Sequence, residues 1–76
     1  MPTAISKPRY KEYDVVRLLT NLPGYELSTG VLGAVLLVYP GSPPHYEVEF
    51  IDDKGQRLAL LTVNENQVEL AMESLS

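Results

Sequence analysis

The side chains in this chain that could do chemistry begin with its only histidine. His45 directly follows Pro44, and Glu47 lies two residues further on, on the same face of a predicted strand. A bound metal ion needs about three or four ligands of suitable type, and one histidine with one carboxylate does not supply them. The two side chains are better interpreted as an exposed pair at the surface. The sequence therefore predicts no metal site around His45.

Nucleophilic catalysis also lacks a recognisable arrangement. Ser28, Thr29 and Ser42 are hydroxyls in predicted loops, and no sequence signature joins any of them to a base such as His45. Cysteine is absent from the 76 residues, which excludes a disulfide framework, a thiolate zinc site and a cysteine nucleophile. We therefore expect a protein that is not an enzyme and that carries no cofactor.

Two further patterns could bind ions, and each has a simpler structural interpretation. Gly30 and Gly33 fit neither of the common phosphate-loop patterns, so we expect them at turn and bulge positions of a sheet. Glu49, Asp52 and Asp53 offer carboxylate oxygens, but their spacing lacks the alternating aspartates that wrap a calcium ion. The two aspartates are therefore predicted to belong to a solvated turn.

Charge is distributed unevenly along the chain. Six lysines and arginines stand against ten aspartates and glutamates, a net charge of −4 at pH 7. Residues 1–17 contain four bases and two acids, whereas the remainder contains two bases and eight acids. Nucleic-acid binding rests largely on basic side chains that neutralise phosphate, so an acidic body favours a basic or apolar protein partner instead. The four N-terminal bases are Lys7, Arg9, Lys11 and Arg17.

Targeting and membrane-spanning signals are not visible in the sequence. The N-terminal residues MPTAISKPRY lack the apolar stretch of about 7 to 15 residues that a secretory signal requires. The most apolar segment, residues 31–39, is interrupted by Gly33 and has about half of the 20 residues that a transmembrane helix needs. We therefore expect a cytoplasmic protein without membrane contact, in which residues 31–39 form a strand.

Turn signals at short intervals predict a small all-β domain. Residues 1–9 are interpreted as an N-terminal arm and residues 10–76 as one domain, since a chain of this length buries a single small core. Pro23 and Gly24 are placed as the central pair of a type II turn, and Gly55 closes a hairpin turn at residues 52–55. The predicted strands are residues 13–19, 31–39, 45–51 and 57–63, with a loop at 21–30 and a proline-rich reversal at 40–44.

The third predicted strand, HYEVEFI at residues 45–51, alternates between apolar and polar side chains. Tyr46, Val48 and Phe50 share one face and are expected in the core. The opposite face is expected in water, and it holds His45, Glu47 and Glu49.

The C-terminal segment allows two interpretations. Val68, Ala71, Met72 and Leu75 recur at helical spacing and favour an amphipathic helix. Alternatively, residues 65–67 form one helical turn and a fifth strand begins at Val68. A helix of about ten residues is marginal without packing, and a barrel needs a last strand to remove an open edge. We therefore favour the turn and strand, with Asn64 and Gln67 as a capping box before it.

Five short strands, a long first loop and a short helical turn before the last strand describe an SH3-like barrel. The strings YDVVRLL, LPGYELSTGVLGAVLLVY, YEVEF and LALLTV, with the Gly30, Gly33 and Val35 pattern, resemble the small bacterial domain-of-unknown-function family 4926. The likeness covers residues 13–64. It implies a stand-alone, non-catalytic module, and it suggests the smaller, antitoxin-like member of a two-gene pair.

The strongest functional signal is an excess of apolar side chains on strands that cannot bury both faces. Residues 31–39 and 57–63 are apolar on both sides, and large exposed apolar patches are uncommon on soluble monomers. We therefore predict a surface for a protein partner or for self-association. Tyrosine suits such surfaces because it combines a large apolar area with a polar tip. The predicted interface residues are Tyr25, Glu47 and Glu49, together with Val35, Leu37 and Tyr39 if these three form the outward set of residues 31–39.

Two alternatives remain open at this point. The outward apolar set could be covered by the chain's own C-terminal segment. The chain could also be a KOW-like module that contacts RNA or a ribonucleoprotein, which requires Lys7, Arg9, Lys11 and Arg17 to converge on one surface.

Overall fold

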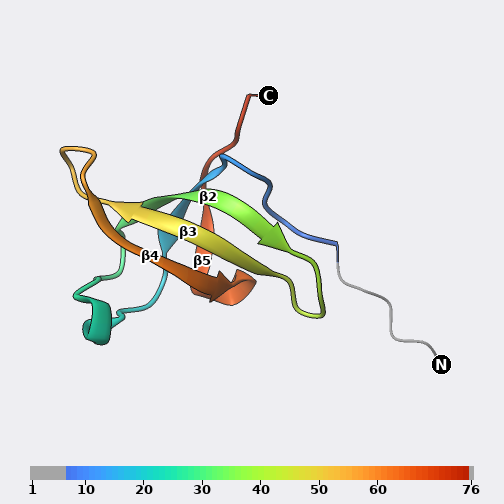
Figure 1. The fold of residues 1–76 in the computed structure, drawn as a ribbon, viewed down its shortest axis with the longest axis horizontal. Helices are drawn as coiled ribbons and strands as arrows, with labels where there is room; N and C mark the ends of the chain where they lie inside the picture. The colour runs from blue at the N-terminus through green and yellow to red at the C-terminus, as the bar shows by residue number, and fades with distance from the viewer. Residues whose placement is uncertain (1–6, 76) are drawn as a thin grey trace.

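The computed structural model describes residues 7–75 and shows a small all-β domain of antiparallel strands with little helix (Figure 1). Residues 1–6 of the predicted arm and Ser76 lie outside the described residues. Within the described residues the elements are β1 (Val15–Leu18), η1 (Pro23–Tyr25), β2 (Leu32–Tyr39), β3 (His45–Ile51), β4 (Arg57–Asn64), η2 (Glu65–Gln67) and β5 (Val68–Met72), where η marks a 3-10 helix.

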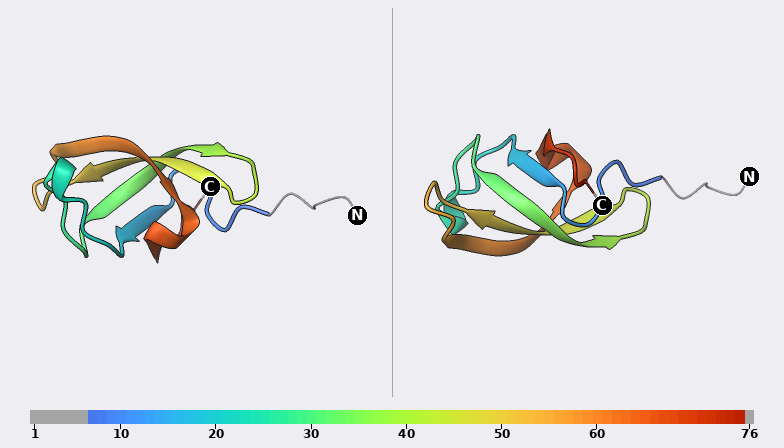
Figure 2. Two further views of the ribbon diagram at one scale, coloured as in Figure 1. Left: turned by 90° about the horizontal axis from the view of Figure 1, so that it is seen from below. Right: turned by 90° about the horizontal axis from the view of Figure 1, so that it is seen from above.

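The strands form one sheet in the order β4-β3-β2-β1-β5, and every neighbouring pair is antiparallel. β2, β3 and β4 make a twisted meander, and β1 and β5 lie behind it (Figures 1 and 2). The sheet therefore curls, with its core on the inner side. β4 and β5 are the two edges, and within residues 7–75 each pairs with one neighbouring strand only.

The hydrophobic core fills the inner side of the curled sheet. The alternation of β3 is confirmed, because Tyr46, Val48 and Phe50 are completely buried. Burying a large apolar side chain contributes roughly 1.5–3 kcal/mol relative to leaving it exposed. The other buried apolar residues come from the remaining strands, the loop after β1 and the arm: Tyr10, Val16, Leu18, Leu27, Val35, Val63 and Val68.

The C-terminal segment follows the second of the two interpretations. Residues 65–67 form a 3-10 turn and Val68 begins β5, so the turn and strand are confirmed and the amphipathic helix is wrong. The predicted capping box is also present. Asn64 Oδ1 accepts a hydrogen bond from the N–H of Asn66 at 2.8 Å, and Gln67 Oε1 accepts one from the N–H of Asn64 at 3.0 Å. These bonds end β4 and turn the chain toward β1.

The loop after β1 differs from its prediction. The type II turn is wrong, because Gly24 does not take the positive φ that this turn requires. Pro23 instead begins η1, and Glu26 takes the left-handed conformation with φ of 57°. Leu22 and Leu27 form a bridge across the loop, and the Leu27 side chain is buried. Burial of Leu27 decides this turn more strongly than the local Pro-Gly preference.

The turn between β3 and β4 agrees with the sequence. Gly55 has φ of 79°, and its N–H donates to the carbonyl of Asp52 at 3.0 Å. Asp52 Oδ1 accepts from the N–H groups of Lys54 at 2.9 Å and Gln56 at 2.8 Å, so this carboxylate is occupied by the turn. β1 begins two residues later than predicted, because Tyr13 has φ of 69° and leaves the extended conformation.

Candidate protein interface

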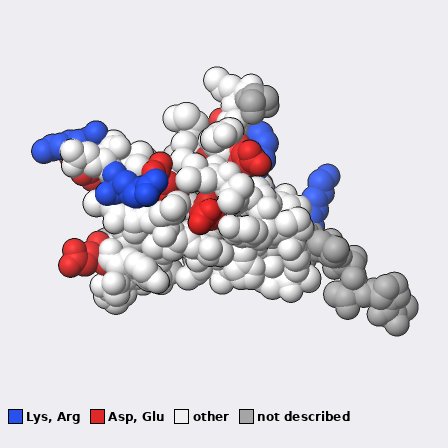
Figure 3. Space-filling model, viewed as in Figure 1, with Lys and Arg blue, Asp and Glu red and all other residues white. Residues whose placement is uncertain are grey.

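The outward side of the β2–β3–β4 meander carries many apolar side chains. Its five large apolar residues on β2 and β4 are each 40–46% exposed. Figure 3, which views this side, shows a broad uncharged area with a few acidic side chains on it and with basic side chains toward its margins. We call this surface the outer face, and it consists of Leu32, Ala34, Leu37, Tyr39, His45, Glu47, Glu49, Ile51, Leu58, Leu60 and Thr62.

A β-bulge in β2 determines which of its side chains reach the outer face. Val35 opposes Val48, whereas Leu37 opposes Glu47, so Leu36 is an extra residue in this strand. The bulge shifts the alternation by one position. Val35 is 0% exposed, and Leu37 beyond the bulge is 45% exposed. The expectation that Val35 shares one face with Leu37 and Tyr39 is therefore wrong, because a regular period of two was assumed along the whole strand.

The other predicted interface residues are exposed or half-buried. Tyr25 and Tyr39 are exposed as expected, but they lie apart, because η1 and the end of β2 are at opposite ends of the sheet (Figure 1). Leu37 pairs with Glu47 and lies on the same face as Tyr39. The structure thus brings together Leu37, Tyr39, Glu47 and Glu49, and it leaves out Tyr25 and Val35.

The acidic side chains of β3 run through the middle of the outer face. Glu47 lies between Leu37 of β2 and Thr62 of β4 in the sheet register, and no ion pair to it is formed within residues 7–75. Glu49 forms an ion pair with Arg57, with 2.8 Å between Oε2 and Nε. Apolar side chains of β2 and β4 therefore lie on both sides of the two glutamates of β3. One of these glutamates, Glu47, has no ion-pair partner within residues 7–75.

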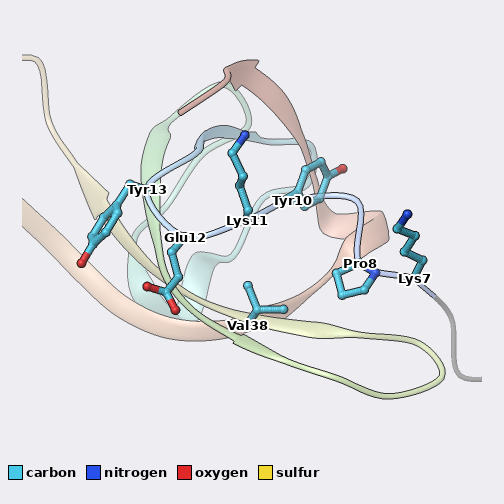
Figure 4. A pocket seen from close by; sticks show the side chains of 7 residues that line it. All are labelled: Lys7, Pro8, Tyr10, Lys11, Glu12, Tyr13 and Val38. Atoms are coloured by element: carbon cyan, nitrogen blue, oxygen red, sulfur yellow. The ribbon is translucent and has the colours of Figure 1, made fainter. Parts of the chain in front are cut away.

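The basic residues of the N-terminal region do not form a free positive surface. Arg9 Nε lies 3.6 Å from Glu65 Oε1, and Arg17 Nη1 lies 3.0 Å from Glu69 Oε2. Lys11 Nζ lies near two further carboxylates, 3.3 Å from Asp14 and 3.6 Å from Glu73. In Figure 4, Lys7 and Lys11 extend from the arm as it passes over Val38, along a shallow groove shared with Pro8, Tyr10, Glu12 and Tyr13.

A buried carboxylate holds the arm against the core. Glu65 is buried, and its Oε2 accepts hydrogen bonds from the Tyr46 hydroxyl at 2.5 Å and from the backbone N–H of Arg9 at 2.9 Å. Burial alone would raise the pKa of Glu65, but these two donors and the positive charge of Arg9 together outweigh it and hold the pKa below its ordinary value. Burial, together with the bond to Glu65, raises the pKa of Tyr46 to about 12.

A second buried carboxylate holds the other end of the described chain. Asp14 accepts hydrogen bonds from the N–H of Ser74 at 2.6 Å and from the N–H of Lys11 at 2.9 Å. Burial acts to raise the pKa of Asp14, but these bonds and the Lys11 ammonium lower it overall. Neither acid was predicted from the sequence. Their positions were a usable signal, because Asp14 directly precedes β1 and Glu65 directly follows β4.

Among residues 7–75, histidine, aspartate and glutamate side chains do not gather in groups of three or more that could hold a metal ion. In the same part of the chain, no helix is long and apolar enough to cross a membrane.

Fold and surface together define a small all-β domain whose distinctive feature is an exposed apolar face. A family model, Domain of unknown function (DUF4926), matches residues 12–70, which include β1, β2, β3, β4 and most of β5. The chain belongs to this family, as its strand sequences suggested. No curated protein and no solved structure matches the chain.

Proposed function

We propose that this domain is a non-catalytic protein-binding module whose outer face docks on a partner protein. The observation that carries the proposal is the surface around Leu37, Tyr39 and Glu47. There, apolar side chains that a monomer would normally bury are exposed on both sides of a row of glutamates. Tyrosine is among the residue types that supply most of the binding energy at the centre of protein interfaces.

The charge on the outer face favours a partner of different sequence. If two copies stacked face to face, Glu47 and Glu49 of one copy would lie close to the same residues of the other. Of these two glutamates, Glu49 alone has a compensating base, Arg57, among residues 7–75. Like charges brought together in an interface are costly, whereas a lysine or arginine on the partner would pair with Glu47. We therefore infer a partner surface that is apolar with at least one basic side chain.

We further propose the setting of this module. The strand order, the curl of the sheet and the helical turn before β5 support an SH3-like barrel that is open between β4 and β5. The family resemblance supports a bacterial cytoplasmic protein, and it favours the antitoxin-like member of a two-gene pair. The partner is then the product of the adjacent gene.

A binding titration with the purified product of the adjacent gene tests the proposal. Leu37→Asp places a charge on the outer face and should weaken binding at least tenfold. Leu19→Asp is the matched control, because Leu19 is also 45% exposed but lies after β1, away from the outer face. Glu47→Lys should also weaken binding by reversing the charge. Equal affinities for Leu37→Asp and Leu19→Asp would overturn the outer face as the docking surface, and no binding by the unaltered protein would overturn the adjacent-gene partner.

The KOW-like alternative makes a different prediction. Arg9, Lys11 and Arg17 each pair with a carboxylate, so little free positive charge is available for phosphate. We expect single-stranded RNA to bind more weakly than about 10⁻⁴ M at physiological salt. Micromolar binding that falls steeply as salt is raised would favour the RNA-binding alternative over the protein-binding module.

A further inference from the structure

The free edge of β4 is unusual for an edge strand. β4 has eight residues and pairs with β3 alone among the described strands, and Figures 1 and 2 show it along one border of the sheet. Proteins protect such edges with proline, lysine, a bulge or a short strand. RLALLTVN contains neither proline nor lysine. The irregularity in its pairing lies at its first residues, near Ile51 of β3.

Both faces of β4 are incompletely covered. On the outward side, Leu58 and Leu60 are more than two-fifths exposed. On the inward side, Ala59 and Leu61 remain partly exposed, although Phe50 and Val48, which oppose them on β3, are completely buried. A partner stacked on the outer face would cover the first pair and leave the second open. A strand added beside β4 would cover both pairs and would also satisfy the free backbone N–H and C=O groups.

We propose that this added strand is β4 of a second copy, paired antiparallel about a twofold axis perpendicular to the sheet. Antiparallel pairing suits the strand because β4 carries no acid and a single base, Arg57. With Leu60 on the axis, the regular pairing runs from Leu58 to Thr62, and Arg57 lies beyond it, past the irregularity near Ile51, so no like charges are opposed. Directly opposed residues share a face, so Leu58 meets Thr62 on the outward side and Ala59 meets Leu61 on the inward side.

β5, the other edge of the sheet, is less suited to pair with its own copy. It has five residues, against eight in β4, and it includes Glu69. Glu69 is already held in an ion pair with Arg17 of β1. The difference between the two edges therefore assigns self-pairing to β4.

The pairing has a consequence for the outer face. A twofold axis perpendicular to the sheet places the outer faces of both copies on the same side of one continuous ten-stranded sheet, which follows from five strands in each copy. The dimer would thus present two partner-binding surfaces side by side. This inference does not rest on the proposed function, because β4 pairs through its edge and Leu37 and Glu47 stay uncovered.

Single-cysteine crosslinking tests the pairing and its register. The chain contains no cysteine, so every introduced thiol reports on its own position. Opposed residues of antiparallel strands have Cα atoms about 4.5–5.5 Å apart, within the range of about 4.4–6.8 Å that a disulfide spans. Under mild oxidation Leu60→Cys should give a covalent dimer. Leu37→Cys, which is similarly exposed on β2, is the matched control and should remain monomeric on a non-reducing gel.

Light scattering on the full chain gives an independent measurement. The unaltered protein should have twice the 8.5 kDa monomer mass at micromolar concentration. Leu60→Lys brings two ammonium groups together at the axis and should restore the monomer mass, with an unchanged circular dichroism spectrum because Leu60 points outward. Hydrogen exchange of residues 57–64 should be slower in the unaltered protein than in Leu60→Lys. A monomeric unaltered protein, or crosslinking by Leu37→Cys but not by Leu60→Cys, would overturn the proposal.

The two proposals fail separately. Leu37→Asp should weaken binding of the adjacent-gene product at least tenfold and leave the dimer mass unchanged, because Leu37 lies on β2, two strands away from the free edge. A mixture of Leu58→Cys and Thr62→Cys variants should crosslink as a heterodimer if Leu60 lies on the axis.

Discussion

The hydroxyl of Tyr46 donates a 2.5 Å hydrogen bond to the buried carboxylate of Glu65. This bond joins the middle of the meander to the turn that leads into β5, and the same carboxylate accepts the backbone N–H of Arg9. The Tyr46 ring also contacts Tyr10, with ring centroids 5.1 Å apart. The N-terminal arm, the β2–β3–β4 meander and the turn that leads into the last strand therefore meet at one polar contact inside an apolar core.

Removing the Tyr46 hydroxyl should destabilise the domain. Tyr46→Phe keeps the buried ring but takes one donor away from a buried carboxylate, and hydrogen bonds to charged groups contribute about 1.5–3 kcal/mol. We expect a loss of this size in the free energy of unfolding measured with urea. Tyr39→Phe is the control, since Tyr39 is exposed, and it should change this free energy by less than about 0.5 kcal/mol. Equal losses in the two variants would contradict the role of the Tyr46–Glu65 bond.

Glu65 should contribute a pH-dependent part of stability in acid. Its pKa in the folded protein lies below the ordinary value of 4.5, so the unfolded chain binds more protons in this range. The contribution is full above pH 4.5 and is lost as the pH falls through the folded-state pKa. Urea unfolding at several pH values should show Glu65→Gln less stable than the unaltered protein at neutral pH. The difference should shrink toward acid, and a difference that is constant with pH would contradict the assignment.

Tyr46 should have the opposite effect in alkali. Its pKa is raised from 10.0 to about 12, so the folded protein holds the phenolic proton more tightly than the unfolded chain. Stability is therefore full below pH 10 and decreases as the pH rises toward 12. In an ultraviolet absorbance titration, one of the five tyrosines should ionise last, and Tyr46→Phe should remove that late step. Loss of an earlier step instead would assign the late one to another tyrosine.

Gly33 should not tolerate a larger residue. A Cβ at this position would lie 2.5 Å from Val48 Cγ1 and 2.9 Å from Phe50 Cδ1, both in the packed core. Overpacking of this kind typically destabilises a protein by about 1–3 kcal/mol, and we expect this loss for Gly33→Ala in thermal and urea unfolding. Gly24→Ala is the control, because a Cβ there has open space around it and should leave stability nearly unchanged.

The bulge in β2 predicts contrasting effects on its two sides. Val35→Ala removes a completely buried side chain and should lower the free energy of unfolding by about 1.5–3 kcal/mol. Leu37→Ala should change it by less than about 0.5 kcal/mol, because Leu37 is on the surface. Urea unfolding of the two variants measures the contrast. If Leu37→Ala were the more damaging change, the assignment of faces would be inverted.

The sequence predicted those parts of the fold that depend on local pattern. The alternation of β3, the hairpin turn at Gly55 and the capping box before η2 each follow from neighbouring residues. The fifth strand could also be predicted, because a last strand was needed beside the others. The type II turn predicted at Pro23 and Gly24 was wrong, since burial of Leu27 in the core, rather than the local Pro-Gly preference, decides the conformation of that turn.

The candidate site could be predicted only in part. Leu37, Tyr39 and Glu47 lie at exposed or half-buried positions, as an interface requires, but the extra residue Leu36 moves Val35 into the core. A bulge is hard to recognise in the sequence of a strand that is apolar on both faces, because it shifts no visible alternation of apolar and polar residues. The buried acid Glu65 was missed for a different reason, because its partners are many positions away along the chain.

The pairing of β1 with β5 also has a kinetic consequence. Arg17 and Glu69, which face each other in this pair, are 52 residues apart, whereas the β2–β3–β4 meander is built from adjacent hairpins. Contacts between distant segments require closure of a long loop and so form late. Interactions that form after the transition state mainly slow unfolding. The buried hydrogen bonds of Glu65 and Asp14 should therefore mainly determine the unfolding rate, whereas the meander mainly determines the folding rate.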